Sequence, residues 1–163
     1  MSAIISDCGF YRYRLERFAS PHATLTAVLM VNPSTADADQ DDATIRKLRG
    51  FGERNQWGQI IVGNLFAYRA TDVRDLGKVS DPVGPENDDH LMRLLAEADQ
   101  VVCAWGPIRK QPKVWRNRYL DVLGLIHGTG LDPLCIGEPA KCGHPKHPLM
   151  LSYSSPIQKW KAP

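Results

Sequence analysis

The chain has 163 residues, of which 43% are hydrophobic and 23% are charged, and its formal net charge is +2. A chain of this length buries roughly two-thirds of its unfolded surface, and its composition argues against disordered and fibrous proteins. No apolar run reaches the roughly 18 residues of a membrane span, and the start of the chain lacks the pattern of a secretory signal. We therefore expect one globular domain over residues 1–163, located in the cytoplasm and without a membrane partner.

Strand and helix patterns alternate through the first half of the chain. Residues 9–18 alternate aromatic or apolar side chains with cations, which predicts a half-exposed strand with one basic face. Residues 24–31 form a nearly continuous apolar run that stops at Asn32 and Pro33, as a buried strand does at a turn. A helix follows, and residues 59–66 predict a second buried strand. The inward positions of that helix are Ile45, Leu48, Phe51 and Gly52.

The same alternation continues through the second half. An amphipathic helix precedes a strand at residues 100–105, and another helix precedes a short strand at residues 133–136. Chain rich in glycine and proline then runs to the end. The first helix is predicted to face inward with Leu91, Leu94, Leu95 and Ala98, and the second with Val114, Tyr119, Val122, Leu123 and Ile126.

Strands that alternate with helices predict a three-layer α/β/α sandwich with a mostly parallel central sheet, which here begins with an N-terminal strand or hairpin. Right-handed crossovers place the strand-to-helix loops along one edge of such a sheet, and ligands bind outside the carboxyl ends of the strands. Four segments should therefore meet at one edge: residues 32–42, residues 64–72, residues 105–110 and the tail from residue 137.

The first of these loops places Asn32, Pro33, Ser34 and Thr35 directly after a core strand. Proline fixes the backbone, so the amide of Asn32 is held where it can orient a water molecule or a substrate carbonyl. The alternative is that the asparagine and the serine only cap the following helix.

Acidic residues crowd the end of the same loop. Asp39, Asp41 and Asp42 carry oxygen ligands of the kind that Mg²⁺ prefers, so magnesium is a possible cofactor here. The alternative is that these carboxylates are solvated and favour the positive end of the following helix.

The second and third loops add further polar groups. Asn64 lies near the end of its strand and is followed by Tyr68 and by Arg69, whose planar guanidinium suits a phosphate, although an ion pair with a nearby aspartate would also explain it. In the third loop the aromatic ring of Trp105 precedes a run of cations that includes Lys110, a combination that suits nucleic acid. A solvated helix face with a core tryptophan is the alternative for that run.

Two thiols and two imidazoles lie near the C-terminus, at Cys135, Cys142, His144 and His147. Their spacing lacks a C-x-x-C pair, so we expect no metal, and the sequence leaves open whether this group binds one. Proline follows each histidine and stiffens the loop, which suits His144 or His147 to donate a hydrogen bond to a developing negative charge. An exposed polar loop is the alternative.

Motifs across nearly the whole chain resemble a bacterial and phage family catalogued as domain of unknown function sixteen-forty-three. The motifs are Tyr11-Arg12-Tyr13, Val31-Asn32-Pro33-Ser34-Thr35-Ala36-Asp37, Asp42-x-Thr44-Ile45-Arg46, Asn64-Leu65-Phe66-Ala67-Tyr68-Arg69-Ala70-Thr71-Asp72, Asp81-Pro82-Val83-Gly84-Pro85-Glu86-Asn87-Asp88, Ala104-Trp105-Gly106 and Gly143-His144-Pro145-Lys146-His147-Pro148-Leu149. This resemblance implies no activity.

The order of an Asn-Pro loop, a strand with Asn, a strand ending in Trp-Gly and a His-Pro loop is also similar to the uracil-DNA glycosylase superfamily. That resemblance implies the same fold and assigns Asn32 to orient the attacking water, His144 or His147 to stabilise the departing base, and Asn64 to the strand end that reads the base. Met30 stands where that superfamily usually has glycine. Residues 149–151 occupy the place of its DNA-wedging loop.

The resemblance implies a DNA glycosylase-like hydrolase of N-glycosidic bonds, acting on uracil or a modified base, with DNA or a nucleotide as partner. In this reading Arg69 and Lys110 hold phosphates, while Pro33, Ser34, Thr35, Tyr68 and Trp105 contribute to substrate binding. The alternative is a nucleotide or nucleic-acid binding domain, with or without magnesium, that has no glycosylase activity. The sequence specifies neither protein partners nor the base.

Overall fold

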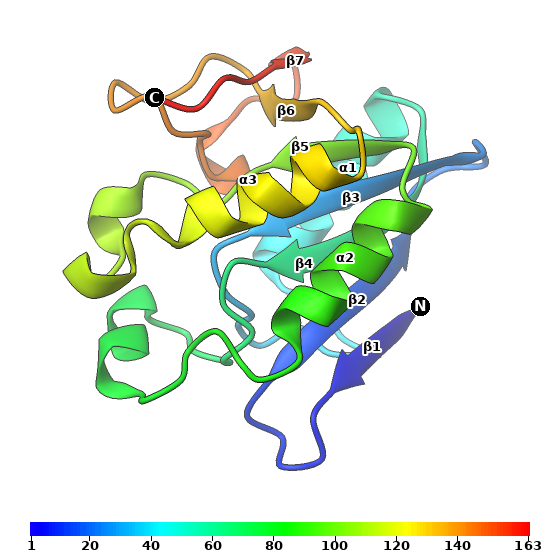
Figure 1. Cartoon of the computed structure of the whole chain (residues 1–163). Helices are drawn as coiled ribbons and strands as arrows, with labels where there is room; N and C mark the ends of the chain where they lie inside the picture. The colour runs from blue at the N-terminus through cyan, green and yellow to red at the C-terminus, as the bar shows by residue number, and fades with distance from the viewer.

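Seven strands form one sheet in the computed structural model, which describes all 163 residues (Figure 1). The strands are β1 (Ser2–Ile5), β2 (Arg12–Phe18), β3 (Thr24–Met30), β4 (Trp57–Asn64), β5 (Gln100–Cys103), β6 (Pro133–Ile136) and β7 (Ile157–Lys159). Their order across the sheet is β1-β2-β4-β3-β5-β6-β7. The four central strands are parallel, whereas β1, β2 and β7 pair antiparallel with their neighbours. The sheet is therefore mixed, which corrects the prediction of a mostly parallel sheet.

Helices cover both faces of this sheet (Figure 1). Side chains of α1 join a hydrophobic cluster on one face, and side chains of α2 and α3 join a cluster on the other. None of the helices is both long and apolar enough to cross a membrane. The α-helices are α1 (Ala43–Arg54), α2 (Asn87–Glu97) and α3 (Arg118–Gly128), and the 3-10 helices are η1 (Val73–Lys78), η2 (Ile108–Lys110), η3 (Lys113–Trp115) and η4 (Pro148–Met150).

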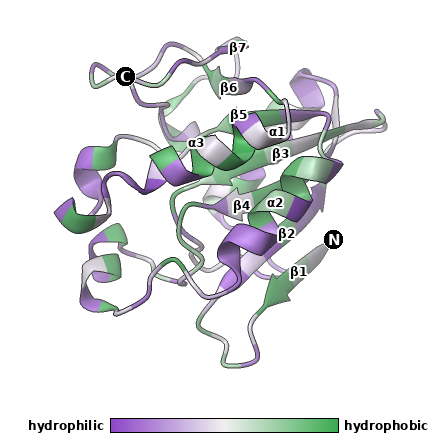
Figure 2. Cartoon of the chain, in the orientation of Figure 1, coloured by the Kyte–Doolittle hydropathy of each residue, from purple (hydrophilic) through white to green (hydrophobic).

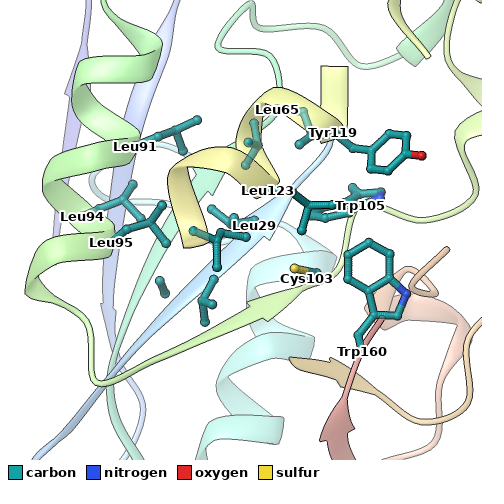
Figure 3. Packing of buried hydrophobic residues seen from close by; sticks show 14 of the residues in the cluster. Leu29, Leu65, Leu91, Leu94, Leu95, Cys103, Trp105, Tyr119, Leu123 and Trp160 are labelled. Carbon is teal, nitrogen blue, oxygen red and sulfur yellow. The ribbon is translucent and has the colours of Figure 1, made fainter. Parts of the chain in front are cut away.

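Hydrophobic periodicity explains where the helices pack. Strands β3 and β5 are mostly hydrophobic, and the leucines of α2 converge with residues of α3 around Leu29 and Cys103 (Figures 2 and 3). Gly63 of β4 permits this close approach, because a Cβ there would lie 2.7 Å from a methyl group of Leu91. The predicted inward positions of α1 are confirmed as its buried residues: Ile45, Leu48, Phe51 and Gly52.

Two parts of the chain differ from the sequence prediction. Val114 is 77% exposed, because the segment before α3 folds into two short 3-10 helices and the α-helix begins only at Arg118. The C-terminal tail was predicted as irregular chain, but Ile157–Lys159 forms the edge strand β7 against β6. A strand of three residues is too short to show an alternating pattern.

The carboxyl ends of the parallel strands lie together on one side of the molecule, as predicted (Figure 1). Asn32 and Pro33 follow β3 and stop it, while Asn64 is the last residue of β4. The chain beyond the strands stays paired, since the N–H of Leu65 donates to the carbonyl of Met30 at 2.9 Å. The loops that leave these strand ends enclose the site described next.

Candidate functional site

A cavity of about 770 Å³, here called the central cavity, lies at the carboxyl ends of β3 and β4. The loop after β3, the start of α1, the loop after β4 and helix η4 all contribute to its wall. Its polar and charged lining residues are Arg12, Asn32, Ser34, Asp42, Thr44, Asn64, Thr71, Asp72, Lys110 and His147. Several predicted site residues, far apart in sequence, therefore share one wall.

Asn32 is fixed in this wall by its own side chain. Its Nδ2 donates to the carbonyl of Ala70 at 2.7 Å and to that of Pro33 at 3.0 Å. The backbone N–H of Ala70 in turn donates to Pro33 at 2.9 Å, which joins the loop after β3 to the loop after β4. Because Nδ2 is engaged, Oδ1 is the atom of Asn32 that remains to accept a hydrogen bond from a water molecule or a ligand.

Asn64 lines the same cavity with a side chain that is 1% exposed, and neither its Nδ2 nor its Oδ1 has a hydrogen-bond partner. An unpaired buried amide is costly, so such a group points to a partner that completes it. The backbone beside it is firmly held. Asn87 Nδ2 donates to the carbonyls of Asn64 and Leu65 at 3.0 and 3.2 Å, and Arg118 Nε donates to that of Leu65 at 3.0 Å.

His147 presents a neutral donor to the cavity. Its Nδ1 accepts the N–H of Leu149 at 3.3 Å, so the ring proton resides on Nε2. Burial lowers the pKa of His147 below its ordinary value, and the charge of Lys110 lowers it further. At neutral pH the ring is therefore an uncharged hydrogen-bond donor, suited to an oxygen that gains negative charge.

Arg12 lines the cavity and was not predicted as a site residue. The alternating pattern of residues 9–18 assigned it to an exposed basic face, but both Arg12 and Tyr13 are buried. The pairing of β1 with β2 shifts register between Ile4 and Ile5, opposite this position, and the irregularity breaks the alternation. No local sequence signal marks such a shift.

His144 and Trp105 do not line the central cavity. His144 is buried with its ring edge-on to Tyr119, at 4.7 Å between ring centroids, and near Trp160. Trp105 packs against Tyr119 and Trp160 in the same cluster (Figure 3). Trp160 Nε1 donates to the carbonyl of Gly143 at 2.8 Å, which holds this part of the loop against the core. Of the two predicted histidines, only His147 reaches the cavity.

Ser34, Thr35 and Arg69 line a smaller pocket of about 310 Å³ next to the central cavity, and Ser34 lines both. Arg69 Nη1 donates to the carbonyl of Gly9 at 3.3 Å and forms no ion pair with an aspartate, while its contact with a phosphate stays a prediction. Tyr68 stacks against Phe10 and lines neither pocket. Pro33 is buried and does not line the cavity.

The acidic residues of the first loop have structural partners. Asp41 pairs with Arg17 at 2.5 Å and with Arg49 at 3.0 Å, and Asp42 caps α1 by accepting the N–H of Ile45 at 2.9 Å. Asp39 is exposed. No three histidine, cysteine or acidic side chains of the chain come together as a set of metal ligands. Magnesium at these aspartates stays a prediction.

The cysteines of the C-terminal group are also apart. Cys135 is buried in β6, where its thiol donates to the carbonyl of Gly137 at 3.3 Å, whereas Cys142 is exposed. Burial raises the pKa of Cys135. Neither thiol lines the central cavity.

Acidification should destabilise the protein through His144 and His147. Burial lowers the pKa of both His144 and His147, so below about pH 6.5 the unfolded chain takes up protons that the folded chain refuses. We expect the melting temperature to fall by several degrees between pH 7 and pH 5. The variant His144→Phe should show a smaller fall in thermal denaturation, and an equal fall would contradict this account of His144.

Another pocket, of about 490 Å³, also adjoins the central cavity and shares Asp72, Val73 and Lys110 with it. We call it the basic pocket. Arg74 bonds Asp72 and lowers its pKa to about 2, whereas Lys110, like Arg109 and Lys113, forms no ion pair. Its lining residues are Asp72, Val73, Arg74, Arg109, Lys110, Gln111, Pro112, Lys113 and Arg116. Unpaired cations beside a cavity favour anionic ligands.

A family model described as "Protein of unknown function (DUF1643)" matches residues 12–149. No significant match was found among curated proteins or among solved structures. The matched region begins at Arg12 and ends at Leu149, both of which line the central cavity. The chain thus belongs to the DUF1643 family of proteins of unknown function.

Proposed function

We propose that the central cavity binds a nucleobase, carried by a nucleotide or by DNA, and that the protein hydrolyses its N-glycosidic bond. The buried, unpaired amide of Asn64 carries this proposal. A nucleobase edge places donors and acceptors side by side, and an amide offers one of each, so Asn64 and a base can complete one another. The resemblance to the uracil-DNA glycosylase superfamily assigns the same residue to base reading.

The residues around Asn64 supply the other parts of the reaction. Oδ1 of Asn32 accepts a hydrogen bond from a water molecule and directs it toward the sugar carbon that bears the base. The C–N bond breaks as the C–O bond forms, and one proton of the water ends on the departing base. His147 donates its Nε2–H to a base oxygen that becomes negative in the transition state. Each contact is one that strengthens as charge develops.

Two further features support a substrate within nucleic acid. Leu149 and Met150 line the cavity from η4 and are 49% and 76% exposed, which suits apolar contact with an opened base stack. The basic pocket beside the cavity suits the neighbouring phosphates.

The direct test is base release from a panel of single- and double-stranded oligonucleotides that carry uracil or other modified bases. Alkali then cleaves the chain wherever a base has been lost. We expect cleavage with at least one base. Absence of cleavage across the whole panel, with free nucleotides also intact by chromatography, would remove hydrolysis from the proposal.

Charge reversal in the basic pocket should weaken oligonucleotide binding. Arg109 and Lys113 line this pocket without ion pairs, so the double variant Arg109→Glu, Lys113→Glu loses two phosphate contacts. We expect affinity, measured by fluorescence polarisation, to fall at least about tenfold at low salt, and the slope of log affinity against log salt to decrease by roughly one to two. The control Lys161→Glu reverses an exposed charge away from this pocket. Equal losses in the control would contradict the assignment.

Nucleotide binding without hydrolysis is the second candidate, and Met30 favours it. Its side chain lines the cavity near Asn32, where the glycosylase superfamily usually has glycine, and it occupies space beside the proposed water. Binding of nucleotides with no release of base would support this candidate. The variant Met30→Gly then tests the obstruction, because hydrolysis should appear if the methionine alone prevents it.

A further inference from the structure

Three arginine side chains of the protein are buried, and one of them differs from the other two. Arg17 pairs with Asp41 at 2.5 Å, and Arg118 pairs with Asp88. Arg12 is 3% exposed and forms no ion pair, and it alone of the three lines the central cavity. A buried cation normally has a carboxylate partner, because removing a charge from water is expensive.

The hydrogen bonds of Arg12 are also incomplete. Nη1 donates to the carbonyl of Ala36, while Nε is buried and has no partner. Burial lowers the pKa of Arg12 to about 10, a shift that the charge of Asp42 opposes, so the group stays protonated at neutral pH. The fold therefore retains a buried positive charge with an unused donor.

The acids that line the cavity are already occupied. Asp42 caps α1, and Asp72 is bound by Arg74, whose Nη2 lies 2.5 Å from its Oδ2. The free groups are donors instead. Lys110 forms no ion pair, and the N–H groups of Ala43 and Thr44 at the start of α1 have no backbone partner. The positive end of a helix thus faces the cavity beside Arg12, as at many anion sites.

We propose that the ligand of the central cavity presents a phosphate group to Arg12, so that the protein takes a phosphorylated nucleotide in preference to a nucleoside or free base. A planar guanidinium donates two parallel hydrogen bonds to a phosphate, and the unpartnered Nε lies on such an edge. The inference rests on the proposed binding of a nucleotide in this cavity, and it does not require hydrolysis. The phosphate belongs either to a free nucleotide or to a strand.

The test compares ligands that differ only in phosphate. Thermal denaturation of the Asn32→Ala protein, in which turnover is expected to be slow, is measured with nucleosides, with their 5′-monophosphates and with short oligonucleotides. We expect the phosphorylated ligands to raise the melting temperature by about 5 °C at a hundredfold excess over Kd, and nucleosides to raise it less. The difference should disappear when Arg12→Gln is added. A larger effect of oligonucleotides than of monophosphates identifies a strand as the source.

The inference would be overturned if nucleosides raised the melting temperature as much as monophosphates do and Arg12→Gln left both shifts unchanged. The proposed function would remain intact in that case. Inorganic phosphate alone separates the phosphate site at Arg12 from the binding of a nucleotide when the nucleotide proposal fails. If it stabilises wild type but not Arg12→Gln while no nucleoside or nucleotide binds, the phosphate site stands and the nucleotide proposal fails.

A second measurement needs no ligand. Replacing Arg12 by methionine removes an unpaired buried charge, so Arg12→Met should melt within about 2 °C of wild type or above it. Arg17 is the comparison, because its buried charge is paired with Asp41. Arg17→Met should lower the melting temperature by about 10 °C. If Arg12→Met loses as much as Arg17→Met, Arg12 serves the fold and the inference is wrong.

Discussion

Replacing Asn32 by alanine should reduce the rate of base release by at least about 100-fold, the usual effect of removing a group that orients or activates a reacting water. Alanine removes the Oδ1 to which the proposed reaction assigns the direction of the water, and it also removes the two hydrogen bonds from Nδ2 to Pro33 and Ala70. Rates are measured under single-turnover conditions, so that binding and product release do not mask the chemical step.

The two roles of Asn32 can be separated with a second variant. Asn32→Asp keeps an acceptor oxygen in place but loses the donor that joins the loops. If orientation of water dominates, Asn32→Asp should retain more activity than Asn32→Ala despite an equal or greater loss of stability. Gln40→Ala is the matched control, because Gln40 is exposed in the same loop and lines neither the central cavity nor the smaller pocket. Wild-type rates in a folded Asn32→Ala protein would exclude this role.

The largest loss of stability is expected at Arg17. Its buried guanidinium contacts the carboxylate of Asp41 at 2.5 Å and the carbonyl of Glu16 at 2.8 Å, and it also donates to the carbonyl of Asp37. Burial alone would raise the pKa of Asp41, but hydrogen bonds from Arg17 and Arg49 hold it below its usual value. Arg17→Met leaves these acceptors unpaired, and we expect a loss of about 3–5 kcal/mol in the free energy of unfolding by urea denaturation.

Arg46→Met is the control for that measurement. Arg46 is exposed and donates to the carbonyl of Asp41, so its loss should change stability by less than about 0.5 kcal/mol. Equal losses of stability in Arg17→Met and Arg46→Met would show that the buried ion pair of Arg17 contributes no more than the exposed hydrogen bond of Arg46. The loss at Arg17 should also diminish in acid, because Asp41 has its depressed pKa only in the folded protein and its pairing is lost as pH falls through that pKa.

Hydrophobic patterning predicted most of this fold, because long buried strands and helices carry clear periodicities. The apolar run before Asn32 and the helical spacing from Ile45 to Gly52 are such cases. The short edge strand β7 escaped prediction, and so did the balance between parallel and antiparallel pairs. Edge pairing depends on which chain segment reaches the sheet, and a local pattern does not encode that.

The candidate site was predictable where it follows strand ends. Asn32 and Asn64 come directly after or at the end of core strands, and both line the cavity. The two histidines could not be told apart, since each precedes a proline, and only the packing of Trp160 against the loop separates them. Arg12 was missed because an irregular strand register turns its side chain inward.

The hydrogen bonds from Asn87 and Arg118 to the end of β4 determine how the cavity can respond to a ligand. On one side these two side chains fix the carbonyls of Asn64 and Leu65, and on the other the N–H of Leu65 is bound to β3. The wall that carries Asn64 is thus preorganised, so little conformational entropy is lost when a ligand binds there. Adjustment to ligands of different size then falls to another part of the lining, the short helix η4 with its exposed apolar side chains. Selectivity for the polar edge of a ligand and tolerance of its bulk would accordingly be properties of different segments of the chain.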